Sequence, residues 1–467
     1  MFKKYEMDLT NGNFYKKILI YTIPLFLTAA LQLFYNAADL IICGLFGSGN
    51  ATGAISSTNS ISGFLVQFSV GISLGANAVM ARCYGANNKE KGQRVVYSSM
   101  LISIYLGLAL GTIGFIFADD VLELLNTREE LIELSTLYLR IFFLSVPFSL
   151  IYNFGASLFR AIGDSNRPFI FLTISGIANI ALNSLFVIVF KMDVAGVAIA
   201  TVISQALSAI LIVISLLKYN GFFHFKLKEM KLSKAEAIEI YQVGLPAGIQ
   251  NSIFSISNML IQSSINSLGT AVVSGSGAAS SIEGFVLSAM NSFGQACMVF
   301  VSANYGAKKK ENMKKIIMIS FLYIFLSNIL LGSIVLGFSR ELIFLYVRKQ
   351  EDTLREASIQ AGIGKLLTMV PFYFFCGYMH LFGFAMRGIG HSTPPMIITL
   401  AGVCGIRIIW VYTIFQMEMF HTIEGLVLSY PVSWAITASI NLVFLIHYMR
   451  KLHFTISKND EMREENA

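Results

Sequence analysis

Long apolar segments separated by short polar stretches occupy almost the whole chain. Twelve segments are each long enough to cross a bilayer, for which a helix needs about 20 mostly apolar residues. They lie at approximately 16–43, 54–80, 95–118, 131–158, 168–190, 194–217, 240–266, 277–303, 315–338, 358–385, 394–416 and 423–449. Continuous apolar runs favour helices, because strands of a membrane barrel alternate apolar and polar residues. We therefore predict an all-α membrane protein of about 12 transmembrane helices.

The twelve segments form two sets of six that resemble each other. Four sequence matches recur in the same order, at offsets between 221 and 227 residues. The paired sequences begin at Pro24 and Pro246, Tyr84 and Tyr305, Val146 and Val370, and Arg160 and Arg387. Six helices per half give both halves the same orientation, so we expect two pseudo-symmetric bundles related by an axis along the membrane normal, with a cleft between them. We predict bundles at 1–220 and 240–450, a cytoplasmic connector at 221–239 and a cytoplasmic tail at 451–467.

The basic residues predict how the chain crosses the membrane. If the N-terminus is cytoplasmic, 25 of the 34 Lys and Arg residues fall on the cytoplasmic side and six on the other side. This alternation agrees with the enrichment of Lys and Arg in cytoplasmic loops, so we expect both termini inside.

Composition removes several classes of protein. Only 13% of residues are charged, against about 25% in soluble domains, and 55% are hydrophobic. The net charge of +7 lies in short loops, so we expect no nucleic-acid partner. The sequence shows no nucleophile motif, metal cluster or phosphate loop, so we expect neither an enzyme nor a cofactor.

A single acid stands out in the first segment. Asp39 follows some twenty residues compatible with a membrane, on the outer half of the predicted helix. A charge in lipid costs several kcal/mol, so this carboxyl should be protonated, paired or turned toward a polar cavity. There it could exchange a proton or bind a small cation. The alternative is that Asp39 lies at the outer water boundary.

The second half has amides where the first half has this acid. They are more numerous than lipid-facing positions allow, so we expect them to line a wet cleft, with structural hydrogen bonding as the alternative. The candidates for a substrate cavity are Asn36, Gln250, Asn251, Asn258, Gln262, Glu283, Gln295 and Arg407. Glu283 either attracts a cationic substrate or lies at the surface. Arg407 either neutralises Glu283 or contacts substrate.

Two further cations occupy nearly equivalent places in the halves. Arg140 and Lys365 stand seven and six residues before the prolines of the two VPF sequences. We expect both to extend to the outer interface, as long basic side chains do. The alternative is a pair of buried cations that binds an anionic group.

These features together resemble the multidrug and toxin extrusion (MATE) family of transporters, particularly its prokaryotic branches. The resemblance covers nearly the whole chain and rests on Pro24, Asp39, the two YGA sequences and the two loops that begin at Arg160 and Arg387. It implies two six-helix bundles enclosing a V-shaped cavity. It also implies export of organic, often cationic, compounds, driven by inward flow of protons or sodium ions.

The resemblance assigns roles to particular residues. It places the coupling carboxylate at Asp39 and polar partners at Asn179, Asn183 and Thr201, which would also hold Na⁺ if sodium is the coupling ion. It makes Pro24 the point at which the first helix bends during transport, and the alternative is a static kink. The position of Asn183 is often aspartate in relatives. The loss of that carboxylate modestly favours protons over sodium.

The predicted function is therefore a cation-coupled antiporter working by alternating access. We expect a monomer in the prokaryotic cytoplasmic membrane whose partners are small organic compounds and membrane lipid. The alternative is a lipid-linked saccharide flippase of the wider superfamily, although such relatives commonly have fourteen helices and more basic cavities. The substrate itself is not predicted.

Overall fold

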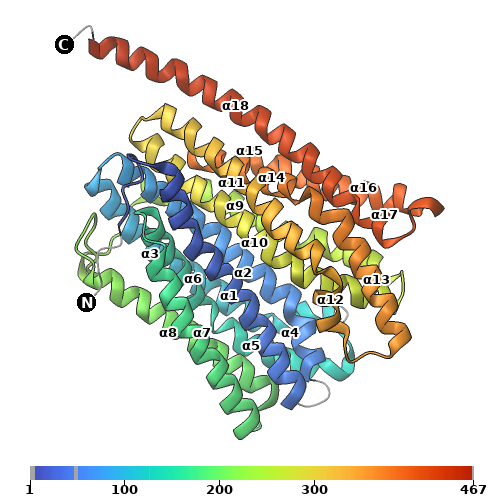
Figure 1. Ribbon diagram of the computed structural model, residues 1–467. Coiled ribbons are helices and arrows are strands. Elements are labelled where there is room, and N and C mark those ends of the chain that lie inside the picture. Colours follow the sequence, from blue (N-terminus) through green and yellow to red (C-terminus); the bar gives the residue numbers. More distant parts are fainter. Residues whose placement is uncertain (1–5, 47–50, 126, 465–467) are drawn as a thin grey trace. The chain divides into compact units, whose positions relative to one another are not determined.

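The computed structural model describes residues 6–46, 51–125 and 127–464; the side chains of residues 36, 40, 41, 44, 52, 255, 256 and 453–464 lie outside this description. Regular structure in the described ranges is helical apart from one bridge between Asn220 and His224 (Figure 1). The predicted all-helical class is confirmed.

The chain divides into two compact units. The first comprises Met1–Leu9 and Ile23–Ser252, and the second comprises Thr10–Thr22 and Ile253–Ala467. Two helices, α1 (Phe14–Phe46) and α9 (Lys234–Asn266), contribute residues to both units. In α1 the division falls next to Pro24, which lies inside the helix.

The helices of the first unit, besides its parts of α1 and α9, are α2 (Ala51–Gly85), α3 (Lys89–Ile116), α4 (Ala118–Leu124), α5 (Glu129–Phe143), α6 (Val146–Ala161), α7 (Asn166–Ser184), the π-helix η1 (Leu185–Val189), α8 (Asp193–Lys218) and the 3₁₀ turn η2 (Leu227–Glu229).

Glycines bring α2 and α9 together. A Cβ atom at Gly75 would lie 2.1 Å from the carbonyl oxygen of Ile240. Small residues allow such close backbone approach between membrane helices.

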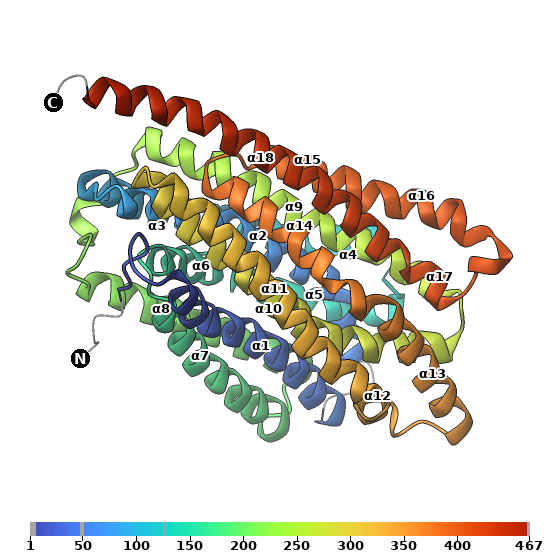
Figure 2. The ribbon, with the colours of Figure 1, turned by 45° about the horizontal axis from the view of Figure 1, so that its top comes forward.

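The second unit continues with α10 (Thr270–Gly306), α11 (Lys310–Gly337), α12 (Ser339–Val347), α13 (Asp352–Met369), η3 (Val370–Phe372), α14 (Tyr373–Gly388), α15 (Thr393–Thr399), the π-helix η4 (Leu400–Gly405), α16 (Ile406–Tyr412), η5 (Ile414–Gln416), η6 (Glu418–Phe420), α17 (Ile423–Val427) and α18 (Ser429–Glu464). The long α18 runs beside α14 and α15 in both views (Figures 1 and 2).

The internal repeat is visible in the helices themselves. α3 and α11 each have 28 residues, and both ends are offset by 221 positions. A π-helical segment follows α7 as η1 and follows α15 as η4. Such segments are rare and are frequent at functional sites.

Ten helices of the described chain are long and apolar enough to cross a membrane, or eleven if α5 and α6, bent by 43° at their junction, form one span. The segment predicted at 240–266 is not among them. The corresponding helix, α9, has 33 residues, so its length suffices, but its many amides and serines make it less apolar. The chain is a multi-pass membrane protein.

Candidate functional site

The acid of α1 belongs to a chain of polar side chains in the first unit. The Asn183 amide nitrogen donates a hydrogen bond to the Asp39 carboxylate and another, 3.2 Å long, to the Asn179 amide oxygen. Asn179 in turn donates to the Ser204 hydroxyl at 3.3 Å. Both asparagines are buried, and Asp39 is half-buried. The carboxylate is therefore held by neutral groups, without a basic partner among its described hydrogen bonds and ion pairs.

Helix geometry explains how these groups meet. Asn179 and Asn183 are four residues apart on α7 and share one face of it. The neighbouring helix α8 brings its hydroxyls to that face. Of these, Ser204 joins the network, whereas the Thr201 hydroxyl donates to the carbonyl of Val197 in its own helix at 3.0 Å. Thr201 was predicted and Ser204 was missed.

The network leaves one oxygen available for a ligand. The Asn183 amide oxygen is buried and has no hydrogen-bond partner among the described residues. Buried polar atoms of this kind usually have a partner, so the atom suits a proton donor, a water or a cation. Sodium as cargo would find oxygen ligands on Asp39, Asn179 and Asn183, as hard cations prefer. Nowhere in the described ranges do three His, Cys, Asp or Glu side chains form a group that could hold a metal ion.

Pro24 precedes Asp39 in the same helix, α1. It is buried, and the Thr28 hydroxyl donates to its carbonyl oxygen at 2.7 Å. Proline has no amide hydrogen, so α1 lacks one backbone hydrogen bond at this point and bends more easily. The side chain of Asn36, a predicted cavity residue on the same helix, lies outside the described residues.

A buried ion pair lies in the second unit, between α10 and α13. The Lys365 ammonium is 3.4 Å from the Glu283 carboxylate, and the two side chains are only 6% and 8% exposed. Lys365 also donates to the Ser280 hydroxyl at 2.6 Å. The expectation that Lys365 extends to the outer interface is therefore wrong, because a carboxylate and a hydroxyl are available inside. Its counterpart Arg140 instead pairs with Asp119, and both of those side chains are nearly half exposed.

Arg407 has a different environment from the one expected. Its guanidinium stacks 3.8 Å from the ring centre of Tyr430 and lies within 6.0 Å of those of Phe254 and Trp434. It donates to the Asn258 side-chain oxygen at 3.1 Å and to the Ser433 hydroxyl at 3.3 Å. Its neutralisation of Glu283 is not observed, because Lys365 performs that role.

A cavity of about 360 Å³ brings several of these groups together within the second unit. Asn258, Gln262 and Glu283 line it, and Lys365 does too. Of the remaining predicted cavity residues, Arg407 lines an adjacent pocket of about 320 Å³, whereas Gln250, Asn251 and Gln295 line neither. Four aromatic lining residues were missed, and these are Phe254, His380, Tyr430 and Trp434. Of these, His380 alone lies in the aromatic-rich sequence at residues 373–384, and no pattern in the sequence marked the others.

The sequence is similar to those of known proteins. The MatE family model matches residues 24–185 and 246–413, once in each half. The probable multidrug resistance protein YoeA of Bacillus subtilis (strain 168) is 26% identical over 434 residues, covering 91% of each chain. The multidrug export protein MepA of Staphylococcus haemolyticus (strain JCSC1435) is 24% identical, covering 67% of this chain and 70% of its own.

The fold has also been seen in solved structures. One is an outward-facing multidrug resistance MATE family transporter of the MOP superfamily, with a TM-score of 0.87 and 20% identity. The match covers 97% of this chain and 100% of that one. At this identity the likeness concerns the helical fold.

Proposed function

The chain belongs to the MatE family, and we propose that it exports small organic, often cationic, compounds across the membrane in exchange for protons or sodium ions. The observation that carries the proposal is the hydrogen-bonded set of Asp39, Asn183 and Asn179, at the position where the family resemblance puts the coupling carboxylate. The relatives YoeA and MepA are a probable multidrug resistance protein and a multidrug export protein, which favours this function over transport of lipid-linked saccharides.

The exchange would operate through the charge of Asp39. As a carboxylate it accepts the hydrogen bond from Asn183, and such charge-assisted bonds are stronger than neutral ones. Binding of a proton or cation would weaken that bond and loosen α1 from α7. Pro24, where α1 lacks one backbone bond, is the natural place for α1 to bend in response. We infer that this movement expels the substrate outward and that release of the ion on the cytoplasmic side resets the transporter. Both termini would lie on that cytoplasmic side.

The composition of the site favours protons as the coupling ion. One carboxylate with neutral partners gives a cation only one full charge. A proton needs only that carboxylate, whereas sodium must also exchange its water for amide oxygens. The unpartnered Asn183 oxygen fits either ion, so the preference rests on the count of carboxylates.

The cavity of the second unit is the proposed place of substrate contact. Lys365 neutralises Glu283, so the cavity carries little net charge. Recognition of a cation would therefore depend on the rings of Tyr430 and Trp434 and on neighbouring amides. A wall of aromatic and adaptable side chains suits loosely specified substrates.

The test uses purified full-length protein in sealed vesicles with a fluorescent organic cation. We expect an imposed pH gradient to drive export and Asp39→Asn to reduce export to the level of empty vesicles. Asp120→Asn, at an exposed acid on α4, is the matched control and should export normally. Normal export by Asp39→Asn would refute the coupling role, and export driven by a sodium gradient alone would refute the preference for protons.

A further inference from the structure

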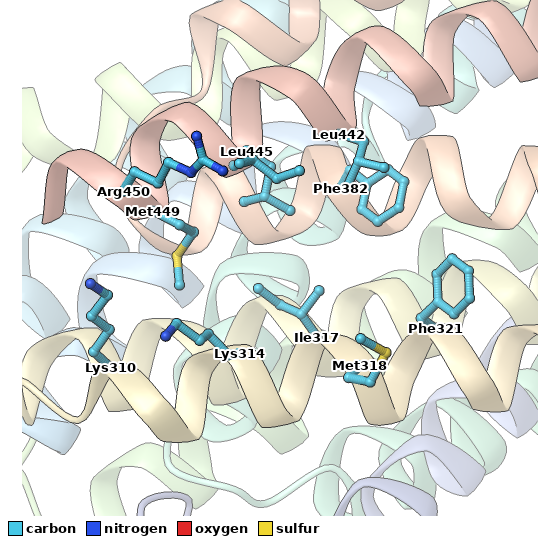
Figure 3. A pocket seen from close by; sticks show the side chains of 11 residues that line it. Lys310, Lys314, Ile317, Met318, Phe321, Phe382, Leu442, Leu445, Met449 and Arg450 are labelled. Atoms are coloured by element: carbon cyan, nitrogen blue, oxygen red, sulfur yellow. The ribbon is translucent and has the colours of Figure 1, made fainter. Parts of the chain in front are cut away.

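The second unit has a groove of about 580 Å³ between α11, α14 and α18, which the site described above does not use. Its two ends differ in character. Lys310, Lys314 and Arg450 gather at one end, and apolar side chains of all three helices line the rest (Figure 3). We call it the α11–α18 groove. An apolar channel that ends in three cations has the polarity of a binding site for an amphipathic anion.

Lys310 is an unusual member of the basic end. It is 9% exposed, and its ammonium nitrogen is buried without a hydrogen-bond partner among the described residues. In Figure 3 it extends from α11 toward α18 into the groove. Burial of an unpaired ammonium is costly. It is also the first residue of α11, where the helix dipole already favours negative charge. An anion at this position would therefore be bound favourably.

The repeat shows what covers the same surface in the first unit. At the offset of 221 residues, Lys310, Lys314 and Met318 of α11 correspond to Lys89, Gln93 and Tyr97 of α3.

The connector after α8 lies on that face of α3. Gln93 accepts a hydrogen bond from the backbone of His224 at 2.8 Å, and the Tyr97 hydroxyl donates to Glu229 at 3.2 Å. The Tyr97 ring packs against Phe225, with their centroids 5.9 Å apart. Nearby, Lys91 pairs with Glu239 at 2.6 Å. In the first unit the connector therefore provides apolar cover and the acidic side chain of Glu229. In the second unit Lys314 pairs with Glu311 of its own helix at 2.8 Å, whereas Lys310 has no hydrogen-bond partner among the described residues.

Within the described residues of the second unit, α18 continues as a helix to Glu464 where the first unit has the connector after α8. We propose that the α11–α18 groove binds one anionic phospholipid of the bilayer. Its phosphate lies among Lys310, Lys314 and Arg450, and an acyl chain follows the apolar part past Met318 and Phe382. The three cations lie near the ends of their membrane-crossing helices, the depth of lipid headgroups. Met318 is 68% exposed on a helix that crosses the membrane, so the apolar part of the groove is open to lipid. A site for a small soluble anion would not need such an open apolar channel.

The test is native mass spectrometry of the full-length protein in neutral detergent, titrated with phosphatidylglycerol or phosphatidylcholine of identical acyl chains. We expect one tightly held phosphatidylglycerol per protein. Lys310→Gln should weaken its binding about fivefold, the share of one basic residue near a membrane surface, and removal of all three cations about a hundredfold. Lys315→Gln changes an exposed lysine on the same helix outside the groove and should have no effect.

A second variant tests the apolar part without touching a charge. Met318→Trp, at an exposed position, should fill the groove and displace the lipid while the protein stays folded, as judged by gel filtration. Equal binding of the two lipids, an equal loss in Lys315→Gln, or equally tight binding of soluble glycerol phosphate would each overturn the proposal. Retention of the lipid in Met318→Trp would overturn it as well.

Discussion

The two units carry different buried charged groups on one repeated pattern of helices. In the first unit a lone acid, Asp39, is held by neutral side chains. In the second, the acid Glu283 is already balanced by Lys365, and Arg407 lies against aromatic rings. The offset of 222 residues puts Ile261, a buried apolar residue, at the place that Asp39 occupies in the first unit.

This difference separates a group that can change charge from groups that keep it. A carboxylate with neutral partners can take up a proton without leaving another buried charge unpaired. A guanidinium stays protonated in proteins, and removing one charge of a buried ion pair leaves the other buried charge unpaired. Under the proposed function the two copies of one framework carry separate tasks: ion response in the first unit and contact with organic groups in the second.

The largest effect should come from opening the buried pair. Lys365→Ala leaves Glu283 buried without its partner, which typically lowers the free energy of unfolding by about 3–5 kcal/mol. The equivalent Arg140→Ala breaks a half-exposed pair, for which about 1 kcal/mol or less is expected. Unfolding in detergent, followed by circular dichroism, measures both values.

The double variant Lys365→Met with Glu283→Gln provides the control for this prediction. It removes both charges together and should recover most of the stability, because neither charge remains unpaired. If Lys365→Ala and Arg140→Ala cost the same, the buried pair has no special place in the second unit and the contrast between the units weakens.

An intermediate effect is expected for the cation held by rings. Arg407 lies 3.8 Å from the Tyr430 ring centre in a buried setting, where such an interaction is worth about 2 kcal/mol. A double-mutant cycle of Arg407→Gln with Tyr430→Leu should therefore show a coupling energy of about 2 kcal/mol in unfolding experiments. Additive losses would mean that Tyr430 is a neighbour without an energetic role.

Sequence patterns predicted the helices and the internal repeat better than the contacts between side chains of different helices. Apolar runs located the helices because a bilayer demands long apolar segments whatever they pack against. The repeat appeared because equivalent loops kept their residues. The pairing of Lys365 with Glu283 could not be read from the chain: the two residues are 82 positions apart, and their meeting depends on how α10 packs on α13.

The same limit applies to the acid network. Asn179 and Asn183 were found because a spacing of four residues puts them on one helix face. The choice between Thr201 and Ser204 was not accessible, since the rotation of α8 decides which hydroxyl meets α7. The π-helical segments that adjoin Asn183 and Arg407 have no sequence pattern that distinguishes them from ordinary helix.

The smallest predicted effect tests the membership of this network directly. Ser204→Ala removes the hydroxyl that accepts from Asn179, a loss of about 1 kcal/mol, or roughly fivefold in apparent affinity for the coupling ion. Thr201→Val removes a hydroxyl that bonds only to its own helix, so the change should stay below about twofold. Export rates in vesicles, measured against pH and against sodium concentration, give both affinities.

Because the two positions share one helix, a general disturbance of α8 would affect them alike. A larger effect at Thr201 would mean that the ion-bound state turns α8 to bring that hydroxyl toward Asp39, and the network described here would then belong to the ion-free state alone.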